Sequence, residues 1–486
     1  MQGNYITMRT MKRWMLVTIL FCGSTMLFTS CSNEDNAQAG DDTPSTVKAK
    51  VGIIIYGNAG GNMDKLIESY FFDKVAPLLS DPSNVRVGVC YKYGRDKANV
   101  IPKPGGETIT IPHTFTGQYA KSGQVVMFEL TSKTPLSSGS LGEKYGTDWP
   151  DMKMYDESTL TEVIDHFKAT MPAEKYIMLI YGHGGGWDSV NDYVREAPAT
   201  GLTRASSRGM LYDEWTQEYI GADALDMYEF RRAVEKSQIP HFDGLFIHSC
   251  LMGNMESLSD IYSLADYTIC SMHTLNSILE TMVSLVNQLQ KDDDFVTASK
   301  AMLKECYEVS DKQYTEVNGD LKLVDDKEFA KLLPICKKLS SRLQAVYPEK
   351  KTEIDDATKK DVYRIEDTSI FVDLQYYAEQ MAKATGDAEL KAIADELGAQ
   401  MKKTIMANNC YYHCPKSKGV KPDFSFSVVA LDKTAYQKEG GVNYTFQTAY
   451  EYTNFHKQTE WGNWLNTVES HPTLDNPMGG YTKPKE

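Results

Sequence analysis

The chain has 486 residues, of which 42% are hydrophobic and 24% are charged. This composition is typical of a globular protein with one large or two medium domains, and it argues against general disorder. The formal net charge of -15 leaves no basic stripe to neutralise phosphates, which excludes nucleic acid as the expected partner.

Residues 1–30 have the pattern of a lipoprotein signal peptide. Three basic residues precede an apolar run at 14–28, which is too short to span a bilayer comfortably and is followed by small residues. The segment closes with Phe-Thr-Ser-Cys, which resembles a bacterial lipoprotein box with Cys31 as the lipidated first residue. The alternative is that Cys31 is an accidental cysteine.

Residues 31–49 are polar and acidic and have no apolar period, so they are predicted to form a flexible tether. The acidic stretch after Cys31 resembles the export tags of bacterial surface lipoproteins. We therefore predict an exported protein that is held at the outer membrane or cell surface through its lipid anchor only.

From Val51 onward, strand and helix patterns alternate. Such alternation is typical of a largely parallel sheet with helices on both faces. The predicted elements are strands at 51–56, 85–91 and 124–130, helices at 63–79 and 160–171, the second beginning near Asp156 or Ser158, and a hairpin excursion at 101–116.

The next strand, 176–181, ends abruptly in Gly-His-Gly-Gly-Gly-Trp, so His183 is expected at the carboxyl end of a strand. Glycines suit a backbone that passes close to a ligand or directs an N–H at a developing oxyanion, because a Cβ would block both. A histidine by itself is more often a satisfied structural residue.

The stretch 243–256 repeats this pattern with a cysteine. An apolar run at 245–247 predicts a buried strand, and helical spacing follows at once, so Cys250 is expected at the junction. A helix N-terminus favours the thiolate form of a thiol. The alternative is a small buried hydrophobe. A His and a Cys on two strand ends can meet, with the imidazole as base for the thiol and acid for the leaving amine.

Between these motifs, the segment 188–208 has no apolar period and is long for a connection in a compact domain, and a helix at 226–236 then leads to the Cys250 strand. After Cys250, the charged run at 349–361 is predicted to be a linker or solvated hairpin that marks a soft boundary. The other elements predicted there are strands at 267–271 and 424–431 and helices at 278–290, 296–308, 329–346 and 374–406.

Nine cysteines occur, two of them in the signal region, and the remaining seven lack zinc-finger spacing. A disulfide framework is therefore not expected. Cys410 and Cys414, with His413 between them, fit a local disulfide, a weak metal site or, in the preferred interpretation, a satisfied loop. No HExxH, P-loop or dinucleotide-binding glycine motif is present.

The motifs around His183 and Cys250 resemble those of the clostripain family of cysteine peptidases, which are related in fold to caspases, gingipains and legumain. Weaker similarity extends over most of the exported chain, at 51–58, 208–215, 265–271 and 459–464. The resemblance implies a caspase-like three-layer α/β sandwich with a mostly parallel sheet. The peptidase domain would span 50–348, and a C-terminal α+β portion, 349–486, would pack on it.

The resemblance also implies the roles of the site residues. Cys250 is the expected nucleophile and His183 the acid/base, and the backbone N–H groups of Gly184 and Cys250 are the expected oxyanion donors. A peptide or protein is the expected substrate. No cofactor or metal is required, although some relatives bind calcium. A loop in this region is cut during self-activation in the family, and Arg195, Arg204 and Arg208 are the basic residues available here; the alternative is a plain surface loop.

Specificity is where the sequence departs from the family, whose members cleave after Arg or Lys and carry acidic residues in the substrate pocket. The position two residues before the nucleophile is His248 here, and Met272 and His273 replace a second acidic stretch. A buried cationic side chain without a counter-charge would be costly. We therefore expect weak cleavage after Arg and Lys, and His248 and His273 would favour an acidic, polar or smaller side chain.

Two other classes of protein fit part of the pattern. An α/β-hydrolase esterase also uses a His-Gly-Gly-Gly oxyanion loop, but it needs a GxSxG nucleophile elbow, and no Ser in this chain has glycines at both positions. A non-catalytic surface binding protein that retains the fold is the second alternative, suggested by the missing acidic pocket.

Overall fold

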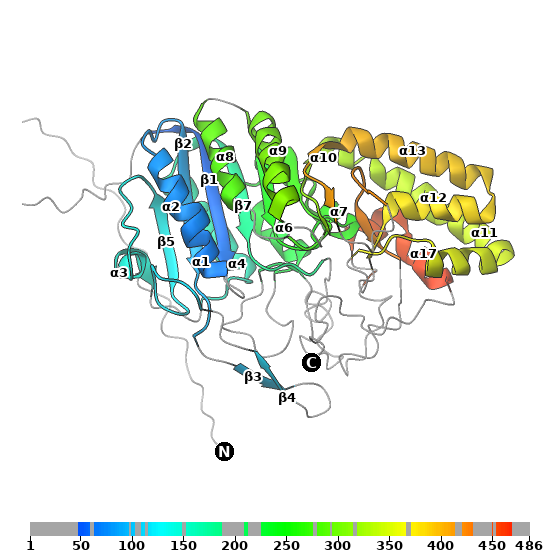
Figure 1. The fold of residues 1–486 in the computed structure, drawn as a ribbon, viewed down its shortest axis with the longest axis horizontal. Helices are drawn as coiled ribbons and strands as arrows, with labels where there is room; N and C mark the ends of the chain where they lie inside the picture. The colour runs from blue at the N-terminus through cyan, green and yellow to red at the C-terminus, as the bar shows by residue number, and fades with distance from the viewer. Residues whose placement is uncertain are drawn as a thin grey trace, which may run out of the picture. The chain divides into compact units, whose positions relative to one another are not determined.

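The computed structural model is organised around a nine-stranded sheet with the order β13-β11-β9-β8-β7-β1-β2-β5-β6 (Figure 1). The five strands from β9 to β2 are parallel, and antiparallel strands flank them at both edges. The mostly parallel α/β sheet predicted from the sequence is therefore confirmed. The structure describes residues 47–58, 63–96, 99–102, 108–111, 115–147, 152–186, 209–211, 225–275, 279–291, 294–313, 318–365, 371–413, 420–430, 450 and 453–468.

The strands of the main sheet are β1 (Ala49–Asn58), β2 (Val85–Lys92), β5 (Val125–Leu130), β6 (Gly146–Thr147), β7 (Ala173–Tyr181), β8 (Gly244–His248), β9 (Tyr267–Cys270), β11 (Lys322–Asp325) and β13 (Ile405–Asn408). Three antiparallel pairs lie outside it: β3 (Asn99–Pro102) with β4 (Thr108–Ile111), β10 (Asn318–Gly319) with β14 (Tyr411–Tyr412), and β12 (Phe371–Asp373) with β15 (Ser427–Val429). The β3–β4 pair is the hairpin excursion that the sequence predicts.

Helices cover both faces of the sheet. On one face lie α4 (Glu157–Thr170), α6 (Met227–Lys236) and α7 (Met255–Ile261), and on the other lie α1 (Met63–Leu66), the π-helix η1 (Ile67–Phe72), α2 (Asp73–Val75), the 3-10 helix η2 (Ala76–Leu78), α8 (Leu279–Gln290) and α9 (Phe295–Gln313). The short α3 (Ser140–Tyr145) packs beside β5. The C-terminal helices are α10 (Asp326–Phe329), α11 (Leu332–Lys360), α12 (Leu374–Thr385), α13 (Ala388–Thr404), α16 (Asn454–Thr459) and α17 (Trp461–Thr467).

Side chains alternate along the central strands between two cores, one on each face. In β1, Ile54 and Tyr56 belong to the core under α4, α6 and α7, whereas Ile53 and Ile55 belong to the core under η1, α8 and α9. Strands buried on both faces must be apolar throughout, which is why these segments read as continuous hydrophobic runs. The result is the predicted three-layer sandwich.

Two helices begin at or next to the residues that the sequence indicated. The start of α4 was predicted near Asp156 or Ser158, and the Asp156 side chain accepts a hydrogen bond from the Ser158 N–H. Asp226, predicted as the first residue of a helix, is instead the N-cap of α6 and forms a reciprocal capping box with Glu229.

Two predictions in the C-terminal half are wrong. The charged run at 349–361 is not a linker, because α11 continues through it to Lys360 with a kink at Lys350, and the predicted boundary at 349 falls inside this helix. The helical segment predicted at 374–406 is two helices, since Gly386 adopts a φ of 67° and ends α12 before Asp387 caps α13.

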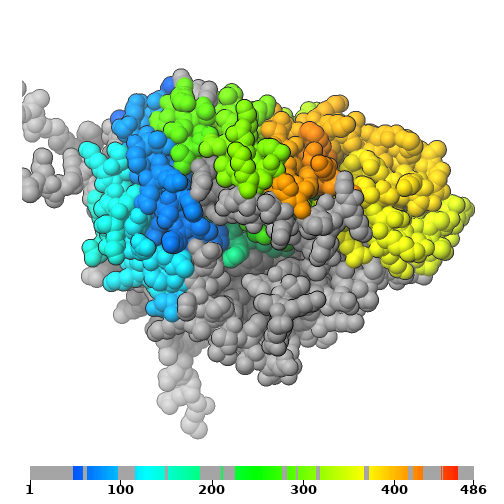
Figure 2. All heavy atoms as spheres, viewed as in Figure 1, coloured from blue at the N-terminus to red at the C-terminus, as the bar shows by residue number. Residues whose placement is uncertain are grey.

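The C-terminal segments pack against the helix that follows Cys250. Buried Glu256 of α7 accepts hydrogen bonds from the Val429 N–H, at 3.0 Å, and from the Tyr450 hydroxyl. At the sheet edge, β13 pairs with β11, and in Figure 2 the orange residues of α13 and β13 lie directly beside the green helices. These contacts hold described C-terminal segments against α7 and the edge of the main sheet.

Candidate active site

Strand register brings the two predicted catalytic residues to the same edge of the sheet. β7 and β8 pair in parallel, with Tyr181 opposite His248. His183 and Cys250 each lie two residues beyond that pair, so both belong to the turns that leave neighbouring strands. Both residues are half-buried.

Gly184 lies against the backbone of Cys250. A Cβ on Gly184 would be 2.5 Å from the Cys250 carbonyl oxygen and 3.1 Å from its nitrogen, so no other residue fits there without displacement. On its other side, Gly184 lies opposite Met210 in an antiparallel β-bridge. The two hydrogen bonds of this bridge come from flanking residues: the Gly185 N–H donates to the Gly209 carbonyl oxygen, and the Leu211 N–H donates to the His183 carbonyl oxygen. This antiparallel pairing does not use the Gly184 N–H.

A residue of β1 also holds the segment 209–211 next to the His183 loop. Asn58, the last residue of β1, donates from Nδ2 to the Leu211 carbonyl oxygen at 3.0 Å. Leu211 is fully buried and has a φ of 60°. Asn58 and this segment lie within the stretches 51–58 and 208–215, for which the sequence indicated family similarity but no role in the site.

The turn after Cys250 differs from the predicted strand-to-helix junction. Leu251 has a φ of 61°, which is uncommon for a residue with a Cβ, and α7 begins only at Met255, after Asn254 as its N-cap. Cys250 is therefore not part of the first turn of that helix. The predicted effect of the helix N-terminus on the Cys250 thiolate stays a prediction.

The loop at 271–275, which follows β9, holds this turn through backbone hydrogen bonds. The Gly253 N–H donates to the Ser271 carbonyl oxygen at 2.6 Å, and the Leu251 N–H donates to the His273 carbonyl oxygen at 3.1 Å. The Leu275 N–H donates to the sulfur of Cys250, with a donor–acceptor distance of 3.3 Å. A donor directed at the sulfur favours the charged thiolate over the thiol.

The other described cysteines have less reactive surroundings. Cys90, Cys270, Cys306 and Cys336 are buried, and Cys250 and Cys410 are half-buried. Burial raises the thiol pKa of Cys90 to about 12 and that of Cys410 to about 12. A raised thiol pKa leaves little of the nucleophilic thiolate at neutral pH.

His248 is a neutral residue at the end of β8. Its ring packs on Tyr181 and Phe246, with ring centroids 5.2 Å and 5.8 Å away, and 4% of the residue is exposed. Burial lowers the pKa of His248 to about 4. Its Nε2 has no hydrogen-bond partner among the residues that the structure describes. This residue therefore carries an unused polar atom but no positive charge at neutral pH.

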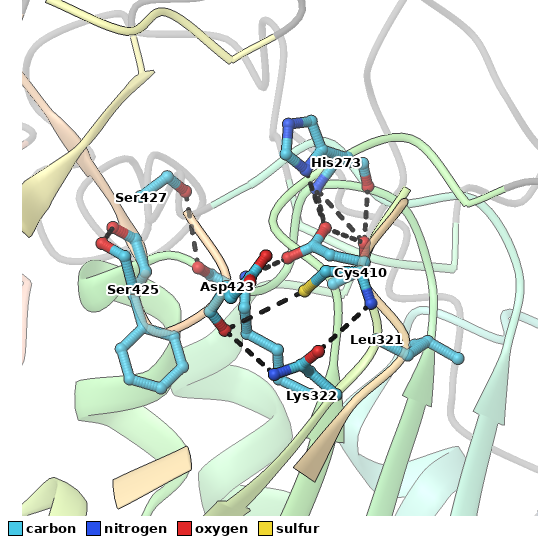
Figure 3. A network of polar contacts seen from close by, with 12 residues as sticks. His273, Leu321, Lys322, Cys410, Asp423, Ser425 and Ser427 are labelled. Carbon is cyan, nitrogen blue, oxygen red and sulfur yellow. Dashed lines mark hydrogen bonds and ion pairs between the residues drawn. The ribbon is translucent and has the colours of Figure 1, made fainter. Parts of the chain in front are cut away.

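His273 and Met272 are both buried, and His273 has no ring nitrogen left for a substrate. Its Nδ1 lies 2.8 Å from Asp320 Oδ1 and its Nε2 lies 3.0 Å from the Tyr363 hydroxyl. Asp320 also pairs with Lys322, and Figure 3 shows His273 and Lys322 in this buried cluster. Burial alone would raise the pKa of the Asp320 carboxyl. The opposing effect of Lys322 and His273 is larger, so the pKa of Asp320 lies below its usual range.

The remaining predicted positions lie outside the described residues: Cys31 and the three arginines of the candidate processing loop, Arg195, Arg204 and Arg208. Within the described residues, no group of three or more His, Cys, Asp or Glu side chains is placed to hold a metal ion. The sequence also gave no signal for Asp320 and Tyr363, which are 47 and 90 residues from His273 along the chain.

Comparison with known proteins agrees with this architecture. A model of the clostripain family matches residues 135–468, which is more than half of the chain. A solved structure of a secreted C11 cysteine protease from Bacteroides thetaiotaomicron, in complex with an irreversible peptide inhibitor, shares 13% identity at a TM-score of 0.52 and covers 85% of this chain and 99% of its own. A second structure, of a secreted C11 cysteine protease from the same organism called iotapain, shares 13% identity at a TM-score of 0.53 and covers 87% and 100%. No curated protein matches the chain.

Proposed function

Because this chain belongs to the clostripain family of cysteine peptidases, whose substrates are peptides or proteins, we propose that it hydrolyses internal peptide bonds with Cys250 as nucleophile and His183 as acid/base. The observation that carries the proposal is the contact between Gly184 and the Cys250 backbone at the ends of two paired parallel strands. That contact joins the loop that carries His183 to the loop that carries Cys250.

In the proposed reaction, the Cys250 thiolate forms a bond to the scissile carbonyl carbon, and the π electron pair of the C=O bond moves to the carbonyl oxygen. When the oxyanion collapses, the C–N bond breaks and protonated His183 gives its proton to the leaving amine, which leaves a thioester. Neutral His183 then takes a proton from water, and the resulting hydroxide displaces the Cys250 thiolate and releases the carboxylic acid. No step requires a metal or cofactor.

We assign the oxyanion to the backbone N–H groups of Gly184 and Cys250. The bridge to Met210 leaves the Gly184 N–H unused, and only glycine fits between Cys250 and the 209–211 segment. One such donor contributes roughly 3 kcal/mol to the transition state in enzymes where it has been removed.

Selective alkylation tests the assignment of the nucleophile. Iodoacetamide at pH 6 is expected to modify Cys250 in preference to Cys410, because an N–H donor faces the Cys250 sulfur whereas burial raises the Cys410 thiol pKa to about 12. The sites are measured by mass spectrometry of digested protein, with urea-unfolded protein as the control in which both thiols react. Equal modification of the two thiols in the folded protein would contradict the proposal.

We further propose that the protein is exported and anchored through a lipid on Cys31, with residues 31–49 as its tether. No helix in the described ranges is both long and apolar enough to cross a bilayer. The support is the basic, apolar and small-residue pattern of residues 1–30 and the Phe-Thr-Ser-Cys sequence at its end.

Cys31→Ser is expected to move the protein from the membrane fraction to the soluble fraction. Acyl chains supply about 0.8 kcal/mol for each buried methylene, and the variant lacks the thiol to which they attach. Immunoblots of fractionated cells expressing either form measure the distribution, and Cys22→Ser, within the apolar run, is the matched control. Unchanged membrane association of Cys31→Ser would rule out the lipid anchor.

A further inference from the structure

The direction of the Leu275 N–H depends on how the 271–275 loop is held. Two of its carbonyl oxygens, those of Ser271 and His273, accept hydrogen bonds from the turn that follows Cys250. The loop itself is fixed on its opposite side, where the His273 N–H donates to Asp320 Oδ1 at 3.0 Å and the Ser271 hydroxyl donates to the same oxygen at 2.9 Å.

The His273 ring completes this attachment through both of its nitrogens. Asp320 only accepts hydrogen bonds, so Nδ1 carries the proton that it receives. Nε2 forms a hydrogen bond with the Tyr363 hydroxyl, whose oxygen accepts from Asn318 Nδ2 at 3.0 Å. His273 and Asp320 are each 1% exposed, so water does not replace these bonds without opening the structure.

We propose that His273, held by Asp320 and Tyr363, is a positioning residue that fixes the 271–275 loop so that the Leu275 N–H stays directed at the Cys250 sulfur. This inference rests on the proposed role of Cys250 as the nucleophile. His273 does not touch the reacting atoms. It acts through its own carbonyl oxygen, which receives the Leu251 N–H, and through the loop backbone two residues further on.

The energetic consequence follows from the charge of the sulfur. A hydrogen bond to a charged acceptor is about twice as strong as one to a neutral acceptor, so an aimed N–H stabilises the thiolate more than the thiol. The Leu275 N–H is the donor that the loop supplies to this sulfur, whereas α7 begins only at Met255. A loop free to rotate would offer this donor for only part of the time.

The pH dependence of Cys250 alkylation tests the inference. The full-length protein and its His273→Ala variant are treated with iodoacetamide from pH 4 to 9, and the rate at Cys250 is followed by mass spectrometry. We expect the apparent pKa of Cys250 to rise by about one unit or more in His273→Ala, and kcat/KM at pH 6 to fall roughly tenfold or more, mainly through kcat. A purely structural role would lower the thermal midpoint without moving this pKa.

Two further variants make the result specific. His273→Asn keeps an N–H donor near the Nδ1 position, so the apparent pKa of Cys250 in this variant is expected to lie close to that of the unaltered protein. Tyr363→Phe removes only the hydroxyl and is expected to shift it in the same direction by a smaller amount. His413→Ala is the matched control, because His413 Nε2 also pairs with a carboxylate oxygen, Asp311 Oδ1 at 2.8 Å, and this pair does not involve the 271–275 loop.

An unchanged Cys250 pKa in both His273→Ala and Tyr363→Phe would overturn the inference, and if His273→Ala does not fold, Tyr363→Phe decides by the same criterion. Alkylation does not require turnover, so this failure is distinct from failure of the proposed function. The latter would appear as peptide cleavage that survives in Cys250→Ala.

Discussion

Replacing Cys250 with Ala is expected to abolish peptide cleavage, with kcat/KM falling by roughly four orders of magnitude or more. Ala has no electron pair to add to the scissile carbonyl, so no acyl-enzyme forms. His183→Ala is expected to cause a loss of similar size, because neither the amine nor the attacking water then exchanges its proton with the protein. Steady-state cleavage of a mixed peptide pool by the purified protein measures both losses.

Folding stability separates this catalytic role from a structural one. Cys250 and His183 are half-buried in turns, so the thermal midpoint of each Ala variant is expected to stay close to that of the unaltered protein. Cys410→Ala, at another half-buried thiol, is the control that keeps its activity. Cleavage by Cys250→Ala would refute the mechanism, and a large loss of stability in that variant would instead assign Cys250 to the core.

The sequence predicted the part of the site that depends on short-range pattern. An apolar run that ends in glycines predicts a strand end at His183, and an apolar run followed by helical spacing predicts one at Cys250. The two residues lie two positions beyond β7 and β8. Parallel pairing then brings such ends together without further information. The cap at Asp156 was equally visible, because a cap acts over three residues or fewer.

The missed features depend on contacts between distant segments. Asp320 and Lys322 look like ordinary surface charges in the sequence, and only the pairing of β11 with β9 buries them beside His273. The run at 349–361 was misjudged because its charges match a solvated helix face as well as they match a linker. The turn at Leu251 has no sequence signal, since its positive φ is enforced by the backbone bonds around it.

Two of the three predicted substrate-binding residues, Met272 and His273, are occupied by contacts within the protein. The prediction that Met272 and His273 bind substrate has no support from the geometry, because both are buried and both nitrogens of His273 are occupied. Asp320 is a carboxylate in this region, but its two oxygens already pair with His273 and Lys322. His248 is then the predicted pocket residue that retains an unpartnered polar atom.

His248→Asp is expected to increase cleavage after Arg or Lys by at least about tenfold, from a low level in the unaltered protein. Burial holds His248 neutral, with its pKa lowered to about 4, so it offers no counter-charge to a cationic substrate side chain. Such a side chain would lose its hydration without gaining an ion pair, a penalty of roughly several kcal/mol that appears directly in kcat/KM. A carboxylate at this position would restore the missing charge.

His248→Asn is the matched control, because Asn has the size of Asp without its charge and is expected to leave the low rate after Arg and Lys unchanged. The measurement is kcat/KM on a peptide series that differs only in the residue before the cleaved bond. If the unaltered protein already prefers Arg or Lys and neither substitution changes that preference, an acidic residue from another segment provides the counter-charge. His248 would then have no part in selecting the substrate, and the unpartnered Nε2 would be a feature of folding alone.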